Sequence, residues 1–390
     1  MELPHSYRGK RHVPVPSGRF VVGCTDLMIG GPTKEDGCFL RIFYPTKLTD
    51  TYANSNDWAT WMPHRKYKEG YAIVRGLTSF IGKRVISWVF GKPYIPVVVD
   101  GEPSNEPPFP VIVFSHGIKS CRTVYSIFCS DISSHGFIVA AIEHRDRSAC
   151  MSYTLEREQS IRGGGLVERW IPYRPLPFER NDMPSRREQL EIRTRECTQT
   201  LDLLARLNDG VQVQHLLHST MDLVIFKGLM DLSSPIIAGH SFGSTTLLRT
   251  LAADKRYKIG LAMDAWMWPL KDEPELAESI EQPILFINSA NFQTRFSLEI
   301  MKRFTADADK RHVVTIKGSI HDSQSDVPCL LPKFIRRFEY PSAIDPLLAT
   351  QLSNRITLLY LRRQLAGYPA DDELSNLVEK SADLLLEGIP

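Results

Sequence analysis

The sequence predicts an α/β protein built around a mostly parallel, doubly wound sheet with helices on both faces. Short apolar runs such as Val111–Phe114 and Ile236–Ala238 are typical of fully buried strands. Most of these runs are followed by segments whose apolar residues have helical spacing. Strands that alternate with helices in this way form parallel sheets. The first two apolar segments are separated only by a glycine-rich turn, so we expect antiparallel N-terminal strands at the sheet edge.

The composition is that of a globular protein and excludes several classes. Of the 390 residues, 43% are hydrophobic and 24% are charged. The net charge of +2 is too small to indicate nucleic acid as a partner. No uncharged run of about 20 apolar residues is present, so we expect no membrane-spanning helix. The N-terminus lacks an apolar signal core and a glycine at position 2, from which we expect neither secretion nor myristoylation.

The cysteines and the short motifs predict no metal and no cofactor. Seven cysteines are an odd number, and no Cys-X-X-Cys pair occurs among them. His-Glu-X-X-His, the Walker loop and a strand followed by Gly-X-Gly-X-X-Gly are also absent. We therefore expect free thiols in a reducing compartment and a cytoplasmic location.

The chain is expected to form one domain over residues 19–390 after an irregular arm at residues 1–18. Residues 50–70 suggest a short helix and a loop. Strands are predicted at residues 19–29, 38–44, 111–114, 137–142, 236–238, 259–263, 283–288 and 312–316. Helices are predicted at residues 122–135, 188–207, 244–251, 297–305 and, as the final element, 346–365. Residues 151–185 are rich in Arg, Glu and Pro and break this alternation, so we expect an irregular insertion there.

A single amphipathic helix is predicted over residues 72–90. Its apolar side chains recur every three or four residues and fall on one face, at Ile73, Leu77, Phe80, Ile81, Val85 and Trp88. This face either packs on the core or lies in a membrane interface, with Phe80, Ile81 and Trp88 as the contacts. Two internal glycines and Arg84 favour the core interpretation, because glycine lowers helix propensity and the arginine interrupts the apolar face.

A Gly-X-Ser-X-Gly motif lies between a predicted strand and a predicted helix. Ile236–Ala238 leads into Gly239-His240-Ser241-Phe242-Gly243, and residues 244–251 follow as a helix. This context is typical of the nucleophile elbow of α/β-hydrolases, in which the serine occupies a strained turn. The two glycines leave no Cβ to collide with the neighbouring strand or helix. Ser241 is therefore the candidate nucleophile.

A carboxylate and a histidine follow Ser241 in the chain order of α/β-hydrolases. Asp264 follows strand 259–263, and His321 lies in the loop after strand 312–316. All three residues are expected at the carboxyl ends of parallel strands, where open α/β sheets bind ligands. A serine hydroxyl needs a base within hydrogen-bond reach and a third group that orients the base. We therefore predict a catalytic triad and metal-independent hydrolysis through an acyl-serine.

Two backbone N–H groups are predicted to bind the negative oxygen that develops during acyl transfer. Phe242 supplies one because it follows the nucleophile. Ile118 is expected to supply the other, since it lies in the loop after strand 111–114 and Gly117 permits close backbone approach. His240 is adjacent to Ser241, but we expect its side chain to point away from the serine.

Four longer motifs together resemble one family. They are Phe114–Ile118, Glu143–Ala149, Gly239–Gly243 and Asp264–Leu270. The chain is similar to the platelet-activating factor acetylhydrolases, the group VII phospholipases A2, in both their plasma and intracellular type II forms. The similarity extends from about Val22 to the C-terminus. The long motifs are highly specific in combination.

The resemblance implies a calcium-independent serine lipase. Its substrates would be phospholipids with a short or oxidised sn-2 acyl chain, including platelet-activating factor. The triad implied is Ser241, Asp264 and His321, and the oxyanion hole is Phe242 with Ile118, where the family usually has leucine. The resemblance also favours the membrane interpretation of residues 72–90, and residues 359–365 are a second candidate contact.

The chain departs from the family pattern at Ser244, where the family usually has glycine. A serine there is expected to crowd the packing of helix on strand without removing the chemistry. Two other functions stay open: a general short-chain carboxylesterase or thioesterase, and a catalytically inactive lipid-binding protein. The sequence does not indicate an oligomeric state.

Overall fold

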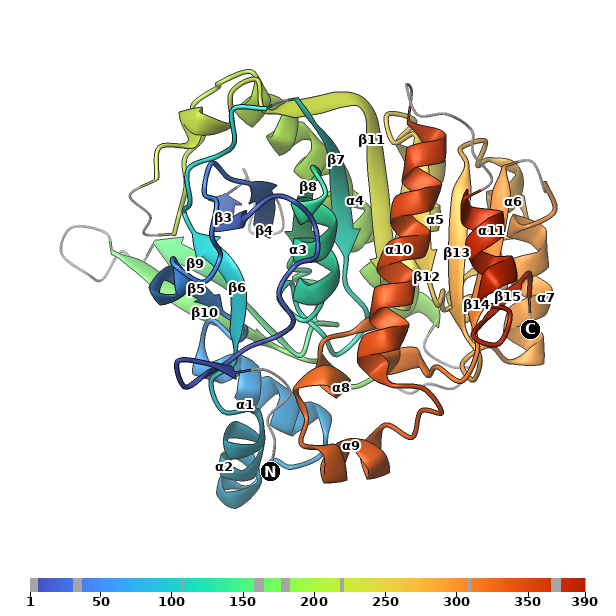
Figure 1. Cartoon of the computed structure of the whole chain (residues 1–390), viewed down its shortest axis with the longest axis horizontal. Coiled ribbons are helices and arrows are strands. Elements are labelled where there is room, and N and C mark those ends of the chain that lie inside the picture. Colours follow the sequence, from blue (N-terminus) through green and yellow to red (C-terminus); the bar gives the residue numbers. More distant parts are fainter. Residues whose placement is uncertain are drawn as a thin grey trace.

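The structure is a computed structural model that describes residues 6–30, 37–106, 108–157, 165–176, 183–217, 221–307, 310–365 and 373–389. Its main sheet has eleven strands in the order β15-β14-β13-β12-β11-β7-β8-β4-β3-β6-β5 (Figure 1). The parallel part consists of β7 (Phe109–Ser115), β8 (Ile138–Ile142), β11 (Met230–His240), β12 (Ile259–Met263), β13 (Ile284–Ser289) and β14 (Arg311–Ile316). These six strands place their carboxyl ends along one edge of the sheet.

The predicted N-terminal pair is antiparallel, as expected. β3 (Val22–Gly30) pairs with β4 (Gly37–Pro45), and β4 runs antiparallel to β8. The pair does not form the edge of the sheet, because β6 (Tyr94–Val99) and β5 (Trp58–Thr60) continue the sheet beyond β3. The opposite edge is β15 (Leu385–Glu387), which pairs antiparallel with β14. Both edges are therefore formed by strands that the hydrophobic pattern did not predict.

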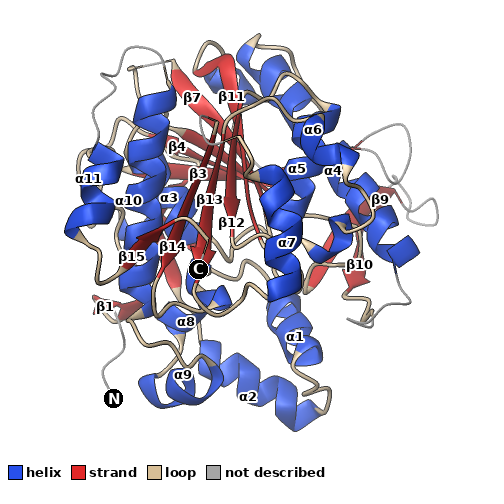
Figure 2. Ribbon diagram, turned by 90° about the vertical axis from the view of Figure 1, so that its right-hand side faces the viewer, coloured by secondary structure: helices blue, strands red, loops and turns tan. Residues whose placement is uncertain are grey.

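Helices cover both faces of the sheet (Figure 2). One face carries α3 (Ser126–Ser134), α10 (Pro346–Gln364) and α11 (Glu373–Lys380), and the other carries α4 (Met183–Asn208), α5 (Phe242–Ala253) and α7 (Arg295–Phe304). A hydrophobic core lies on each face of the sheet, and alternate side chains of β7 enter the two cores. Phe114 packs with the first set of helices and Val113 with the second. This confirms the doubly wound arrangement. Shorter helices are α6 (Glu275–Glu278), α8 (Val327–Leu330), η1 (Ser55–Asp57), η2 (Leu223–Phe226) and η3 (Trp268–Leu270).

The segment at 151–185 is not irregular throughout, so that expectation is wrong. β9 (Met151–Arg157) and β10 (Leu166–Pro172) form an antiparallel hairpin outside the main sheet. Tyr153 and Trp170 are paired across the hairpin, with ring centroids 4.7 Å apart. Cross-strand aromatic pairs of this kind stabilise a hairpin. Residues 158–164 and 177–182 of the expected insertion lie outside the described residues.

The N-terminal arm contains a short antiparallel pair, β1 (Ser6–Tyr7) with β2 (Lys10–Arg11). Residues 1–5 of the arm lie outside the described residues. The division into an arm of residues 1–18 and one domain over residues 19–390 stays a prediction.

The single helix predicted over residues 72–90 is two helices, α1 (Arg65–Val74) and α2 (Phe80–Phe90). Gly76 has a φ of 73°, a left-handed conformation that ends the first helix. Ser79 then caps the start of α2 by accepting a hydrogen bond from the Gly82 N–H. Val89 and Phe90 are buried, whereas the exposed fractions of Phe80, Ile81 and Trp88 are 72%, 74% and 68%. The core interpretation is therefore wrong for the part of this face that lies on α2, whereas Ile73 on α1 packs against the core.

The second apolar surface expected near residues 359–365 is not exposed. Leu361 is fully buried, and Leu359 and Leu365 are half-buried against the core. Two further elements, α11 and β15, follow α10, so α10 is not the final element as expected. Among the described residues, no helix has the length and apolar character needed to cross a bilayer.

Candidate active site

The turn between β11 and α5 holds Ser241 in a strained conformation. Ser241 has φ 58° and ψ −118°, and its N–H donates to the Met263 carbonyl at 3.0 Å. A Cβ on Gly243 would lie 2.0 Å from the Ser115 carbonyl oxygen, and a Cβ on Gly239 would lie 2.4 Å from the backbone of Gly243. Only glycine permits this approach of α5 to the ends of β7 and β11, as the sequence predicts.

Asp264 is fully buried directly after β12 and is held by several donors. Its carboxylate accepts hydrogen bonds from the Ser289 N–H at 3.1 Å, the Ser289 hydroxyl at 2.6 Å and the Gln293 amide at 3.1 Å. The Nδ1 atom of His321 lies 2.7 Å from Oδ2 of the same carboxylate. A neutral His321 that donates from Nδ1 leaves Nε2 as the basic nitrogen.

His321 opens the short helix η4 (His321–Gln324), and its ring stacks on Phe292 and is tilted against His240. The Phe292 ring lies 3.6 Å away, centroid to centroid, and the His240 ring 4.4 Å away. His321 and Ser241 line one pocket of about 380 Å³. In the described part of the chain no hydrogen bond joins Ser241 Oγ to His321, and such bonds are often long before substrate binds.

The loop after β7 lies against Ser241. Gly117 and Ile118 line the same pocket, and a Cβ on Gly117 would lie 3.2 Å from the Cβ of Ser241. Within the residues that the structure describes, the N–H groups of Ile118 and Phe242 have no protein acceptor. Both groups are therefore available to a bound oxyanion, although their role stays a prediction.

A buried network of polar side chains holds this loop in place. Arg193 of α4 donates to the His116 carbonyl at 2.7 Å and to Asp146 at 2.8 Å. His144 bonds both Ser115 Oγ and Glu196, each at 2.7 Å. Burial holds the pKa of His144 well below its ordinary value, so the ring is neutral. Ser115, His144 and Glu196 repeat the bonding of a serine triad, but they are buried and hold the end of β7 in place.

Several residues of the site were not predicted. Ser289, which ends β13, and Gln293, which follows it, hold Asp264 at the same sheet edge as the triad. Their position at the carboxyl end of a parallel strand is a signal that could have indicated them. Phe292 precedes Gln293 in the same loop and shares this position. Tyr125 carries no such signal, because its contacts with the site come from tertiary packing alone.

One group of side chains has the composition of a metal site. His240, Asp264 and His321 place one possible ligand atom each within 4.8 Å of one another among the described residues. The His240 nitrogens already bond Tyr125 and the His321 carbonyl, and Nδ1 of His321 bonds Asp264. These atoms serve a hydrogen-bond network, so we assign them no metal.

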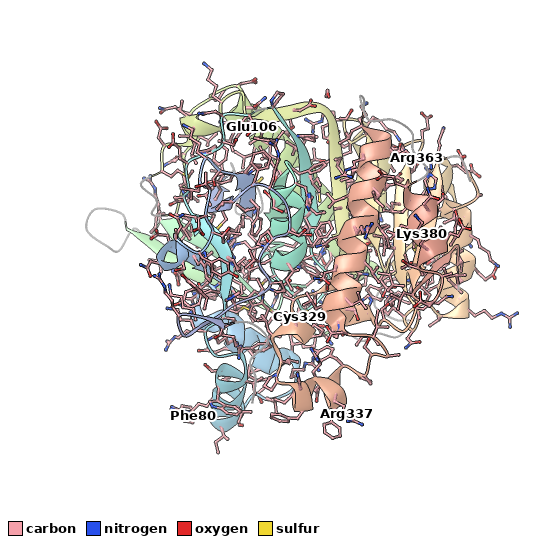
Figure 3. The ribbon with its side chains drawn as sticks, viewed as in Figure 1. Phe80, Glu106, Cys329, Arg337, Arg363 and Lys380 are labelled. Atoms are coloured by element: carbon pink, nitrogen blue, oxygen red, sulfur yellow. The ribbon has the colours of Figure 1, made fainter. Side chains whose placement is uncertain are left out.

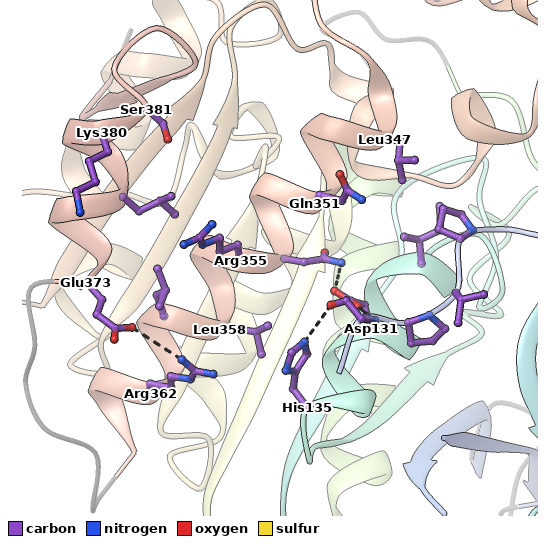
Figure 4. Close-up of a pocket in the computed structure, with 18 of the residues that line it drawn as sticks. Asp131, His135, Leu347, Gln351, Arg355, Leu358, Arg362, Glu373, Lys380 and Ser381 are labelled. Carbon is purple, nitrogen blue, oxygen red and sulfur yellow. Dashed lines mark hydrogen bonds and ion pairs between the residues drawn. The ribbon is translucent and has the colours of Figure 1, made fainter. Parts of the chain in front are cut away.

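A larger pocket of about 890 Å³ lies elsewhere, between α3, α10 and α11 (Figure 4). It is lined by none of the predicted catalytic residues. Among its charged side chains, Arg362 pairs with Glu373 at 3.8 Å. The chemistry therefore belongs to the smaller pocket at Ser241.

The elbow serine, the buried acid and the histidine on a doubly wound sheet define an α/β-hydrolase. The ferulic acid esterase from Streptomyces cinnamoneus has the same fold, with a TM-score of 0.64 and 15% identity over 97% of this chain and 99% of that chain. The family model described as "Platelet-activating factor acetylhydrolase, isoform II" matches residues 5–383, and the chain belongs to this family. It is therefore an esterase.

Named relatives extend over nearly the whole chain. The platelet-activating factor acetylhydrolase of Bos taurus is 34% identical over 381 residues, which are 97% of this chain and 83% of the bovine protein. The acetylhydrolase of Gallus gallus is 31% identical, over 96% of this chain and 89% of its own length. A putative phospholipase A2 of Schizosaccharomyces pombe is 26% identical, over 95% of this chain and 96% of its own length.

Proposed function

We propose that this esterase hydrolyses the sn-2 ester of phospholipids with a short or oxidised acyl chain, platelet-activating factor among them, without calcium. The names of the family and of its relatives support the substrate class. The observation that carries the mechanism is the 2.7 Å contact between Asp264 and His321 in the pocket that Ser241 lines. We assign the nucleophile to Ser241, the base to His321 and the orienting carboxylate to Asp264.

The reaction follows from these positions. Oγ of Ser241 attacks the ester carbonyl while Nε2 of His321 takes its proton. The N–H groups of Phe242 and Ile118 bind the oxyanion, and Asp264 stabilises the imidazolium. The tetrahedral intermediate collapses, and His321 returns the proton to the departing lysophospholipid alkoxide. Water, deprotonated by His321, then cleaves the acyl-serine and releases the acid.

Replacing Ser241 with alanine tests this assignment. We expect kcat on a soluble short-chain ester to fall by roughly 10⁴-fold or more, because only binding and oxyanion stabilisation remain. Ser130→Ala is the matched control, since its buried hydroxyl bonds the Ser126 carbonyl within α3 and leaves the pocket intact. Normal turnover by Ser241→Ala, with the melting temperature unchanged, would contradict the proposed nucleophile.

The exposed face of α2 is the proposed lipid contact, through Phe80, Ile81 and Trp88. We add α9 (Lys333–Glu339), whose Phe334 and Phe338 are exposed and whose Arg337 is suited to a phosphate group. α2 and α9 lie side by side at one end of the molecule in Figures 1 and 2, and Figure 3 shows Phe80 and Arg337 at that end. Exposed aromatic and basic side chains together favour a lipid interface.

The position of the pocket supports this orientation. It is lined by Val74 and Arg75, where α1 ends, and by Tyr340, where α9 ends. Arg75 bonds both Tyr340 and Glu339, which fixes α1 to α9. A phospholipid that leaves a bilayer at α2 and α9 would therefore reach Ser241 over a short path.

The proposed location is cytoplasmic with peripheral membrane association, and the cysteines support the first part. All seven are free and buried in the structure. Thiols in this state are suited to a reducing compartment.

A further inference from the structure

His240, the residue before the nucleophile, connects two loops of the site. Its Nδ1 atom lies 2.9 Å from the Tyr125 hydroxyl, and its Nε2 atom lies 3.1 Å from the His321 carbonyl oxygen. The Tyr125 hydroxyl in turn accepts the Gly117 N–H at 3.2 Å. A continuous chain of three hydrogen bonds therefore runs from the loop of Ile118 to the loop of His321.

For a neutral His240 ring, only one assignment of protons satisfies all three bonds. The His321 carbonyl can only accept, so Nε2 of His240 carries the hydrogen. Nδ1 of the neutral ring is then an acceptor, and the Tyr125 O–H donates to it. The tyrosine oxygen keeps a lone pair for the Gly117 N–H. Burial, together with the nearby His321, holds the pKa of His240 well below its ordinary value, which keeps the ring neutral.

The two central residues of this chain are anchored on rigid elements. Tyr125 is the N-cap residue of α3, and its ring packs on Phe114 of β7 with centroids 4.9 Å apart. His240 is the last residue of β11. Both side chains are buried. Of the groups at the two ends, Gly117 lies in a loop and His321 opens the short helix η4, so the bonds between them help to set their separation.

We propose that Tyr125 and His240 are positioning residues for the hydrolysis, which fix the oxyanion loop relative to the catalytic histidine. The inference rests on the proposed function, because these loops matter together only if Ile118 and His321 act on one substrate. Neither positioning residue touches the reacting atoms. An error of about 1 Å in such a geometry can reduce a rate by roughly 100-fold.

Tyr125→Phe tests the proposal because it removes only the hydroxyl oxygen. We expect kcat on a soluble short-chain ester to fall roughly tenfold, a loss of about 1.4 kcal/mol, while KM changes less than about twofold. Tyr257→Phe is the matched control, since it also removes a buried hydroxyl, which donates to the Cys197 carbonyl of α4 at 2.8 Å. This control should keep its kcat. An equal fall of kcat in both variants would overturn the proposal.

Two substitutions of His240 divide the chain of bonds. His240→Gln keeps an amide N–H near the position of Nε2, so it retains the bond to the His321 carbonyl and loses the bond to Tyr125. His240→Asn places its amide near the position of Nδ1, so it retains the bond to Tyr125 and loses the bond to His321. We expect each to lower kcat. In the His240→Gln background, Tyr125→Phe should lower kcat by less than about threefold, because the connection is already broken. Fully additive losses would overturn the proposal.

The outcome of Ser241→Ala separates this inference from the proposed function. If Ser241→Ala retains turnover, the proposed nucleophile fails and the inference fails with it. If Ser241→Ala is inactive while Tyr125→Phe has the kcat of the wild type, the proposed function stands and only the positioning role is overturned. Thermal unfolding of each variant shows whether the folded state persists.

Discussion

Ser244 lies in the first turn of α5, and its buried hydroxyl bonds two strand ends. The oxygen lies 2.6 Å from the Gly239 carbonyl and 2.9 Å from the Met263 carbonyl. Since both carbonyls only accept, one hydroxyl proton is shared between them. These strand ends lead into Ser241 and Asp264. The crowding expected for a serine at this position is therefore replaced by a bond that connects β11 with β12.

Ser244→Ala should lower the free energy of unfolding by about 1 kcal/mol, the usual net contribution of one buried hydrogen bond. Ester turnover should stay within about threefold of the wild type, because the hydroxyl does not face the pocket. Urea denaturation monitored by fluorescence checks the first value. Ser244→Gly should be less stable still, since glycine lowers helix propensity. Wild-type stability in both variants would contradict this role.

The site residues that could be predicted are those of the triad, because their order along the chain is characteristic of α/β-hydrolases. Ser241, Asp264 and His321 each follow a predicted strand, and the structure brings Asp264 and His321 into contact. Tyr125 could not be predicted, because only folding brings it to His240. Sequence spacing does not encode such contacts.

The helix pair α1 and α2 shows why apolar periodicity can mislead at the level of an element. The spacing of apolar residues continues across residues 75–79 although the helix does not. Gly76 followed by Ser79 is the pattern of a helix end and a new N-cap, and this signal could have divided the segment. The break lets α2 turn its apolar face outward while α1 packs on the core.

Replacing Phe80, Ile81 and Trp88 together with serine should weaken binding to phosphatidylcholine vesicles by at least roughly tenfold. Burial of one such side chain contributes about 1.5–3 kcal/mol, and about 1.4 kcal/mol corresponds to tenfold in affinity. Turnover of a soluble ester should be unchanged, because these side chains lie outside the pocket. Vesicle co-sedimentation and ester assays measure the two effects.

Phe296→Ser is the control for this experiment. Phe296 is 52% exposed on α7, far from α2 in Figure 1, and its loss should leave vesicle binding unchanged. A parallel fall in vesicle binding and in soluble-ester turnover would indicate instead that α2 stabilises the fold.

At the scale of the whole molecule, the central strands of the sheet could be predicted from the sequence, whereas its edge strands could not. The buried parallel strands are continuous apolar runs, and each was located from the sequence to within a few residues, apart from the polar start of β11. β5 and β15 are three residues long, and their pairing depends on the strands beside them. Short edge strands have weak intrinsic signals because strand formation depends on neighbours.

Asp26 connects the N-terminal strands to the parallel part of the molecule. Its carboxylate bonds Arg41 of β4 at 2.8 Å and Arg122, which follows β7, at 2.9 Å. Burial raises the pKa of Asp26, but the two guanidinium groups outweigh burial and hold this pKa well below its usual range. Both arginines are themselves buried. Removal of the carboxylate would therefore leave two buried positive charges with fewer partners.

The lowered pKa of Asp26 predicts that the free energy of unfolding decreases as the solution becomes acidic. The stabilisation is fully present above the pKa of an unfolded aspartate, about 3.9, and is lost as the pH falls below it toward the folded value. Asp26→Asn should lower the free energy of unfolding at pH 7 by about 3–5 kcal/mol. Its stability should also fall less than that of the wild type between about pH 5 and pH 3. Asp272→Asn, at an exposed ion pair with Arg187, should change stability by less than about 1 kcal/mol. Thermal unfolding at a series of pH values measures both effects, and parallel pH profiles for the wild type and Asp26→Asn would contradict the assignment.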